Sequence, residues 1–137
     1  MRIVIDANVF VSAAIRTGPP HQVVEAWLRD GAFDVIVCPN LLNEVREVLT
    51  QRPRLRRWID QSTAEDFLAT VEAFATLVPD PDNVESVTRD PDDDYLVALA
   101  RTHGADHIIS GDKDLLEWAS QDRFVLSPSA FADLLAR

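Results

Sequence analysis

The stretch RDPDDDYLVALARTHGADHIIS, residues 89–110, predicts a helix followed by a strand. Apolar residues recur three and four positions apart from Leu96 onward, which is the spacing of a helix with one buried face. Pro91 suits the first turn of that helix, and Gly104 suits its end. The apolar run at 107–110 is typical of a short buried strand. A helix followed directly by a buried strand indicates an α/β protein.

Short apolar runs and longer periodic stretches alternate through the rest of the chain. We expect strands at 2–6, 33–38 and 123–127, and one more in or beside the turn-rich segment 78–87. We expect helices at 8–16, 21–31, 39–50, 63–77, 114–120 and 128–137, a helical segment at 52–59, a loop at 17–22, and a Ser62 or Thr63 cap on helix 63–77. This alternation predicts a parallel sheet with helices on both faces.

The bulk composition fits one domain spanning residues 1–137, with no clear linker and no internal repeat. The formal charge is −10, from 13 basic and 23 acidic residues. That balance argues against a general nucleic-acid binder, but it leaves room for an enzyme that reaches phosphates through bound cations. No apolar run approaches the roughly 20 residues that span a bilayer, and the first residues do not resemble a signal peptide. We therefore expect a cytoplasmic protein.

Four carboxylates fall where a parallel sheet would bring them together. Asp6 directly follows the first apolar run, and Asp112 follows the run at 107–110. Residues that follow parallel strands meet at the carboxyl edge of the sheet, where ligands bind in this architecture. Glu44 and Asp93 lie in the helices adjacent to that edge. The alternatives are that Asp6 and Asp112 cap the next helices and that Glu44 lies on a solvated face.

The run of aspartates at 92–94 leaves a choice of which one faces the site. Successive residues turn about 100° around a helix axis. Asp92 and Asp93 therefore lie on the two flanks of the face that contains Leu96, whereas Asp94 points well away from it. Asp90 is accounted for by the start of the helix. The apolar centre of the helix lies nearer to Asp93, which favours Asp93 and leaves Asp92 uncertain.

A divalent cation would reconcile these carboxylates with one another. Clustered carboxylates without a cation repel, and some of them must take up protons. Oxygen-only ligands favour Mg²⁺ or Mn²⁺, and the single cysteine and three scattered histidines offer no zinc set. A site of this kind, with one or two ions, suits the hydrolysis of phosphodiester bonds.

Three segments together resemble the PIN-domain family: MRIVIDANVFVSA (1–13), NLLNEVREVL (40–49) and RDPDDDYLVALARTHGADHIISGDKDLL (89–116). The nearest likeness is to bacterial toxins of toxin–antitoxin pairs, the VapC-like ribonucleases. The resemblance covers nearly the whole chain, and the block from Asp90 to Leu116 is its most specific part. It implies a three-layer α/β/α sandwich with a parallel, Rossmann-like sheet.

The resemblance also implies roles for particular residues. The family's four acidic positions, which bind Mg²⁺ or Mn²⁺ and hydrolyse RNA, match Asp6, Glu44, Asp93 and Asp112. Supporting positions match Asn8, Ser12, Ser110 and Asp114, and a shift of the pattern by one residue would select Asp94 in place of Asp93. A cognate antitoxin and a homodimer are the protein partners that the resemblance implies.

Basic residues could contact the RNA backbone near this edge. Arg52, Arg54, Arg56 and Arg57 lie close together in the sequence, and Lys113 is the only lysine in the chain. A solvated face that pairs with nearby acids is the alternative. Trp58 could stack on a base or have a core or interface role.

Other functions on the same architecture are less well matched by the sequence. An aspartyl phosphatase of the haloacid type needs Asp-x-Asp after its first strand, where this chain has Asp6-Ala7-Asn8. A receiver domain needs a lysine at the end of a late strand, and 123–127 has none. A non-catalytic binding module and a nuclease for other nucleic acids outside a toxin–antitoxin context stay as alternatives.

Overall fold

One parallel sheet forms the centre of the protein, whose computed structural model describes residues 1–121 and 123–137. The strand order is β3-β2-β1-β4-β5. The strands are β1 (Arg2–Ile5), β2 (Asp34–Val37), β3 (Thr76–Leu77), β4 (His107–Ile109) and β5 (Val125–Leu126). The helices are α1 (Ala7–Ile15), α2 (Pro19–Asp30), α3 (Pro39–Gln51), α4 (Gln61–Phe74), α5 (Pro91–Thr102), α6 (Lys113–Trp118) and α7 (Pro128–Leu135), with a 3₁₀ turn, η1 (Pro53–Arg57).

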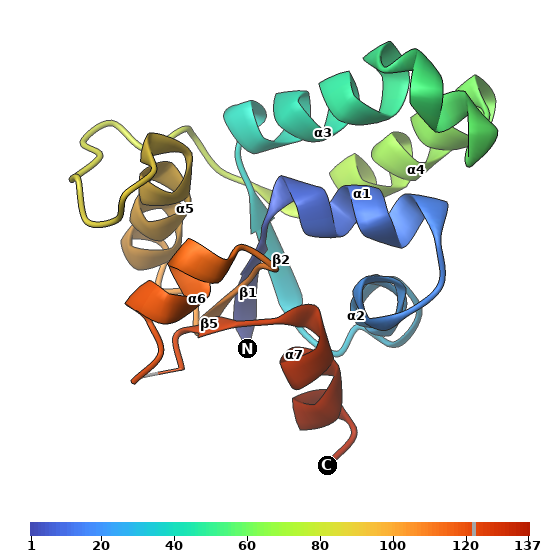
Figure 1. Ribbon diagram of the computed structural model, residues 1–137. Helices are drawn as coiled ribbons and strands as arrows, with labels where there is room; N and C mark the ends of the chain where they lie inside the picture. The colour runs from blue at the N-terminus through green and yellow to red at the C-terminus, as the bar shows by residue number, and fades with distance from the viewer. Residues whose placement is uncertain (122) are drawn as a thin grey trace.

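Helices cover both faces of the sheet, which confirms the predicted three-layer α/β class. Figure 1 shows α5 and α6 on one side and α1 to α4 with α7 on the other. The strands between them are apolar on both faces, and Ile3, Ile5 and Ile109 are fully buried. This double burial explains why the strands appear in the sequence as continuous apolar runs instead of alternating ones. In the described part of the chain, no helix is long and apolar enough to cross a membrane.

The pairing of β1 with β4 determines which residues meet at the carboxyl edge. Val4 is in register with Ile108, and Ile5 with Ile109. The pairing extends one step further, because the Asp6 amide donates to the Ile109 carbonyl at 2.9 Å. The next residues, Asp6 and Ser110, therefore lie next to each other at the ends of the two central strands.

Several helix ends follow the local signals in the sequence. Asp90 caps α5, since its Oδ1 accepts from the Asp92 amide at 2.9 Å. Pro91 and Pro39 occupy the first turns of their helices, where the missing amide proton costs nothing. Gly31 ends α2 with φ of 60°, a left-handed conformation that suits glycine.

Three local predictions are wrong. Helix α2 begins at Pro19, inside the segment 17–22 that was expected to be a loop, because proline is tolerated in a first helical turn. The expected helix 63–77 ends early, and Thr76 and Leu77 instead form the edge strand β3, paired with β2. The cap of α4 is Asp60, which accepts from the Thr63 amide at 2.7 Å, in place of Ser62 or Thr63.

Candidate metal site at the carboxyl edge of the sheet

A buried hydroxyl links the Asp6 carboxylate to the backbone of Asp112, another of the predicted site residues. The Ser110 hydroxyl donates to Asp6 Oδ2 at 2.8 Å and accepts from the Asp112 amide at 3.0 Å. Ser110 itself is fully buried. The Asp6 side chain makes no capping hydrogen bond to α1, and its side-chain partner is Ser110.

Asp112 combines capping with a place in the site. Its Oδ1 accepts from the amides of Asp114 and Leu115 at 2.8 and 3.3 Å, which makes it the cap of α6. A carboxylate has two oxygens and about four acceptor positions. Asp112 can therefore cap α6 and still accept further bonds from a ligand. Capping and metal binding by Asp112 are compatible.

Asp93 carries the most unusual carboxylate of the described residues. Its side chain is 4% exposed, and its Oδ2 atom is buried without a hydrogen-bond partner. One carboxylate oxygen each from Asp90, Asp93 and Asp112 lies within 4.8 Å of the others. In residues 1–121 and 123–137 this is the only group of three or more possible metal-ligating side chains. A hard cation such as Mg²⁺ or Mn²⁺ fits such an all-oxygen set.

The pKa values of the carboxylates at this edge show that burial and nearby negative charges disfavour their ionised forms. Burial, followed by the negative charges of Asp112, Asp90 and Asp6, raises the pKa of Asp93 to about 7. Burial also raises the pKa of Asp6, and the nearby charge of Asp112 adds to this effect. The Ser110 hydrogen bond opposes it. These carboxylates need protons or a cation to coexist.

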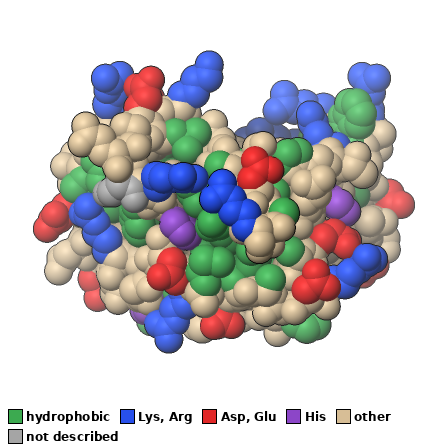
Figure 2. Space-filling view, turned by 90° about the horizontal axis from the view of Figure 1, so that it is seen from below, with side chains coloured by type: hydrophobic (Ala, Val, Ile, Leu, Met, Phe, Trp, Pro, Cys, Tyr) green, Lys and Arg blue, Asp and Glu red, His purple; other side chains and the backbone are tan. Residues whose placement is uncertain are grey.

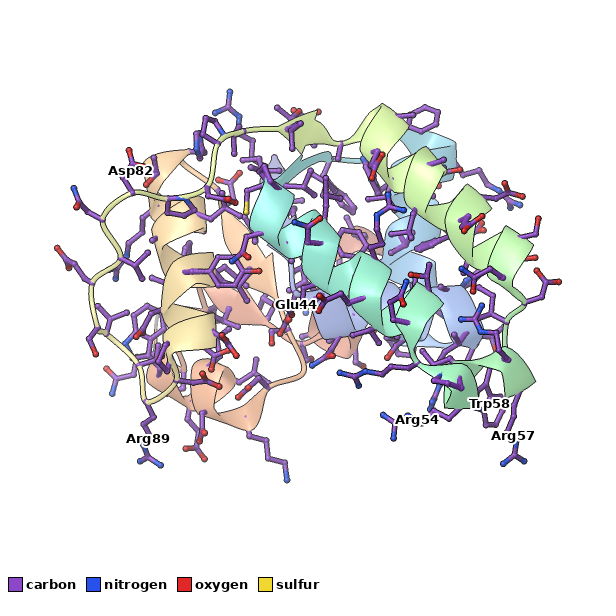
Figure 3. The ribbon with its side chains drawn as sticks, turned by 90° about the horizontal axis from the view of Figure 1, so that it is seen from above. Glu44, Arg54, Arg57, Trp58, Asp82 and Arg89 are labelled. Atoms are coloured by element: carbon purple, nitrogen blue, oxygen red, sulfur yellow. The ribbon has the colours of Figure 1, made fainter. Side chains whose placement is uncertain are left out.

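Glu44 borders this cluster from α3. Its side chain is half-buried, and burial followed by the charges of Asp6 and Asp92 raises its pKa. It does not belong to the group formed by Asp90, Asp93 and Asp112 in the described structure. Figure 3, which looks down on the carboxyl edge, shows Glu44 between the α5 side of the molecule and the arginines of η1.

Asp94 points away from the acidic edge, as predicted, but it is not a solvent-facing residue. It is 5% exposed, and its Oδ1 accepts from the Val87 amide, the Thr88 amide and the Thr88 hydroxyl at 3.1, 2.7 and 2.7 Å. These bonds lower its pKa, the Thr88 hydroxyl contributing most. Asp94 therefore holds the loop before α5 through its Oδ1 atom.

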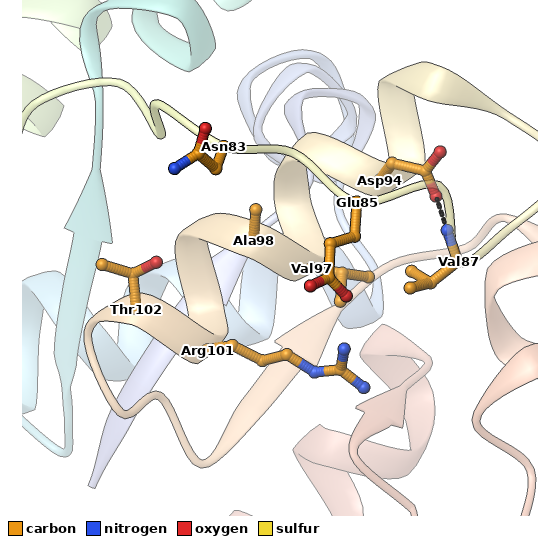
Figure 4. Close-up of a pocket in the computed structure, with 8 residues that line it drawn as sticks. All are labelled: Asn83, Glu85, Val87, Asp94, Val97, Ala98, Arg101 and Thr102. Carbon is orange, nitrogen blue, oxygen red and sulfur yellow. Dashed lines mark hydrogen bonds between the residues drawn. The ribbon is translucent and has the colours of Figure 1, made fainter.

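The same contacts border a cavity of about 290 Å³ between that loop and α5. Figure 4 shows Asp94 at one end of it, bonded to Val87, with Glu85 and Arg101 along its side. None of the four predicted acidic residues lines this cavity. The space is therefore separate from the acidic edge.

The remaining predicted residues lie on both sides of the acids. Asn8 is exposed and Ser12 half-buried on α1, and Asp114 is exposed on α6, 3.9 Å from Arg89. Lys113 is exposed at the start of α6. Among the predicted RNA-binding arginines, Arg56 differs from the others, because its guanidinium donates to the Leu49 carbonyl and to Gln61.

Two residues near the acids were not predicted as part of the site. Asp90 was predicted only to start the helix. An aspartate at that position looks the same in the sequence whether it caps the helix or also binds a metal ion. Tyr95 is 9% exposed, and its buried hydroxyl has no hydrogen-bond partner among the described residues. Burial and the charges of Glu44, Cys38 and Asp6 raise its pKa, so the hydroxyl lies near the site and stays protonated. Tyr95 lies four residues before the buried Leu99 and therefore on the same face of α5. This spacing was the sequence signal that could have indicated its burial.

The sheet and its acidic edge define an α/β protein with a carboxylate site suited to a divalent cation. Residues 2–114 match the PIN domain family, and the chain belongs to that family. PIN domains are generally metal-dependent nucleases, and the acidic cluster agrees with that chemistry.

Two known proteins are similar over most of their length. The chain is 26% identical over 126 residues to Uncharacterized protein MJ1680 of Methanocaldococcus jannaschii, which covers 91% of this chain and 79% of that protein. The fold of the present chain is similar to the crystal structure of PAE2754 from Pyrobaculum aerophilum, with 17% sequence identity and a TM-score of 0.68. The match covers 99% of this chain and 90% of that chain. Neither name mentions a toxin, so the match supports the family and the fold but not the toxin assignment.

Proposed function

We propose that the protein is a Mg²⁺- or Mn²⁺-dependent endoribonuclease that hydrolyses RNA phosphodiester bonds at the acidic edge. The observation that carries the proposal is the buried, unpartnered Oδ2 of Asp93 beside Asp112 and Asp90. An isolated buried carboxylate oxygen costs several kcal/mol unless something compensates it. A bound cation provides that compensation, and it also supplies positive charge for a phosphate substrate in a protein of net charge −10.

The side chains divide the work of such a site. Asp93 and Asp112, with Asp90, Asp6 and Glu44 close by, would hold the cation. Ser110 keeps Asp6 in place through its 2.8 Å hydrogen bond. When bound, the cation supplies Lewis acidity at the phosphate and activates a water for attack on phosphorus. Since Asp6 and Glu44 lie outside the group of three, they suit a second ion or the orientation of water.

The biological setting is part of the proposal and rests on the resemblance alone. We propose a toxin of a type II toxin–antitoxin pair, acting in the cytoplasm and neutralised by a cognate antitoxin that covers the acidic edge. A homodimer is proposed on the same basis. Co-expression with the adjacent gene product, followed by size-exclusion chromatography with light scattering, tests both partners.

The activity is tested with purified protein and total RNA. Wild-type protein is expected to cleave RNA with Mg²⁺ or Mn²⁺ and not with EDTA, and Asp93→Asn and Asp6→Asn are expected to lose cleavage while retaining the fold. Undiminished cleavage by both variants would refute the site assignment. Calorimetric titration with Mn²⁺ separates this function from a non-catalytic binding module, for which no metal binding is expected.

A further inference from the structure

We infer that a groove beside the acidic edge binds a single-stranded segment of the RNA that flanks the bond to be cleaved. The groove lies between α1, α3 and η1 and has a volume of about 470 Å³. We call it the arginine groove, after Arg16, Arg52, Arg54 and Arg57, which line it together with Trp58. The inference rests on the proposed nuclease function and adds where the substrate lies and which form of it is accepted.

Residues of α1 connect the arginine groove to the candidate metal site. Asn8, only two residues after Asp6, lines the groove, and Ser12 lines it one turn further along α1. The first turn of α1 thus joins the acids to the groove. A polynucleotide with one phosphate at Asp6 and Asp93 would meet this groove with its next nucleotides.

The arginines of the groove are free to bind an external anion. Arg16, Arg52, Arg54 and Arg57 are exposed, and none of them has a carboxylate within ion-pair distance among the described residues. By contrast, Arg29, Arg46 and Arg89 each lie within 4.0 Å of a carboxylate. Four unpaired cations in one groove of an acidic protein form the kind of local positive footprint that tracks a phosphate backbone.

The Trp58 side chain adds a surface for a base. It is 60% exposed, an unusual amount for the largest apolar side chain. The Arg57 guanidinium lies 5.9 Å from the centroid of its ring, so a positive charge and an aromatic face stand together. Stacking on an aromatic ring requires an unpaired base with an open face. This feature favours single-stranded RNA over a duplex, and over an acidic protein segment, which would not need the indole.

One further arginine, Arg89, lies on the other side of the acids (Figure 3). Figure 3 labels Arg89 on the α5 side and Arg54, Arg57 and Trp58 on the η1 side, with Glu44 between the two groups in this view. The space-filling view, which looks at the opposite face from below, shows basic side chains in two groups along its upper edge, with a notch between them (Figure 2). The unpaired arginines of the groove therefore lie on the η1 side of the site, since Arg89 on the α5 side lies 3.9 Å from Asp114.

The test measures binding apart from cleavage. The probe is a fluorescein-labelled single-stranded RNA of mixed sequence, with its duplex as the comparison, and binding is followed by fluorescence anisotropy in Mg²⁺ over a range of salt. All variants are made in the Asp93→Asn full-length protein, so that the probe stays intact. Cleavage by the otherwise wild-type protein is measured separately, so failure of the nuclease proposal is visible on its own.

The expected results distinguish charge from stacking. Arg54→Gln/Arg57→Gln is expected to weaken binding and to reduce the slope of log affinity against log salt by about 1.4, since each lost contact to a single strand contributes about 0.7. Trp58→Ala is expected to weaken binding about tenfold with an unchanged slope, and Trp58→Phe to restore most of it. Arg29→Gln, which removes one positive charge from α2 outside the groove, is expected to bind as the parent does.

Other outcomes would overturn the inference. If the double arginine variant and Trp58→Ala bind RNA as the parent does, the arginine groove does not take the substrate. Equal affinity for the duplex would remove the single-strand assignment. If a poly-glutamate peptide binds the groove and the same variants abolish its binding but not that of RNA, the groove belongs to an acidic protein partner.

Discussion

Asp93 and Asp94 are neighbours of the same type and almost the same burial, yet they are in opposite situations. Asp93 is 4% exposed and Asp94 is 5% exposed. Asp94 accepts three hydrogen bonds from the loop before α5, and its pKa is lowered. Asp93 has a buried oxygen with no partner and like charges around it, and its pKa is raised to about 7.

The difference separates a structural carboxylate from a functional one. A buried charge that is fully hydrogen-bonded stabilises the fold that supplies its donors. A buried charge without donors destabilises the metal-free fold, and such a group is retained at sites that bind a cation or a substrate. Burial alone therefore says nothing about function here, and the partners of each oxygen decide.

The sharpest test of this comparison is to neutralise the first aspartate. Asp93→Asn is expected to lower the rate of RNA cleavage roughly 10³-fold or more, because it removes a central ligand of the catalytic ion. Its melting temperature without metal is expected to stay the same or to rise, since a repelling charge is lost. Cleavage assays and thermal unfolding of the same preparation measure both effects.

Asp92→Asn is the matched control, since Asp92 is exposed one residue earlier on α5. We expect it to cleave RNA at close to the wild-type rate. Loss of activity in Asp92→Asn with full activity in Asp93→Asn would reverse the assignment of the two residues.

The next largest effect is a pH-dependent response to metal. The raised pKa of Asp93 means that the folded, metal-free protein holds a proton that the unfolded chain releases at about pH 3.9. The stability of the metal-free protein should therefore fall as the pH rises from that value through about 7. A bound cation replaces the proton, and at a hundred times its dissociation constant it adds about 2.7 kcal/mol.

Thermal unfolding with and without Mn²⁺, at one pH below and one above the Asp93 pKa, measures this response. The increase in melting temperature should be larger at the higher pH and nearly absent in Asp93→Asn. An equal increase at both pH values would show that Asp93 does not compete with protons for the ion.

Removal of the second aspartate should act on stability more than on chemistry. Asp94→Ala leaves the amides of Val87 and Thr88 and the Thr88 hydroxyl without their acceptor, and we expect the melting temperature to fall by several degrees. Because hydrogen bonds lower its pKa, its contribution exists above its ordinary pKa and is lost as the pH falls. Hydrogen exchange at Val87 and Thr88 should accelerate.

The isosteric variant Asp94→Asn keeps one carbonyl acceptor and should lose less stability than Asp94→Ala. A rate of RNA cleavage as low in Asp94→Ala as in Asp93→Asn would break the distinction between the two residues. It would mean that the position of the loop, and not the carboxylate of Asp93, controls activity.

Local patterns in the sequence predicted the parallel sheet and the different directions of Asp93 and Asp94, but not the burial of Asp94. The helical spacing around Leu96 predicted Asp93 toward the buried edge and Asp94 away from it. In the structure Asp93 lies beside Asp90 and Asp112, and Asp94 bonds to the loop before α5, although both residues are buried. The burial of Asp94 was not predictable, because its donors come from a loop whose folded path no local pattern encodes. A strand beside the segment 78–87 was expected, but its residues Thr76 and Leu77 were assigned to the preceding helix, because the pairing of β3 with β2 overrides a helical pattern.

The side-chain partners of the site were the least predictable feature. Arg56 has the same sequence surroundings as Arg54 and Arg57, and only the three-dimensional position of the Leu49 carbonyl separates it from them. Asp90 carries a sequence signal for a helix cap that is correct but incomplete, because its carboxylate also lies beside Asp93 and Asp112.

The smallest expected effect concerns Tyr95, whose hydroxyl resembles Asp93 Oδ2 in being buried without a partner. A raised pKa keeps this hydroxyl protonated, so it can donate a hydrogen bond at any working pH. Since burial of an unpaired hydroxyl is unfavourable, Tyr95→Phe should leave the melting temperature unchanged or slightly higher. Cleavage should slow by roughly three- to tenfold, the worth of one hydrogen bond, if the hydroxyl donates to the phosphate or to the attacking water. A lower melting temperature with an unchanged rate would instead make Tyr95 a structural residue. Asp93 would then be the only unpartnered buried group with a part in the chemistry among residues 1–121 and 123–137.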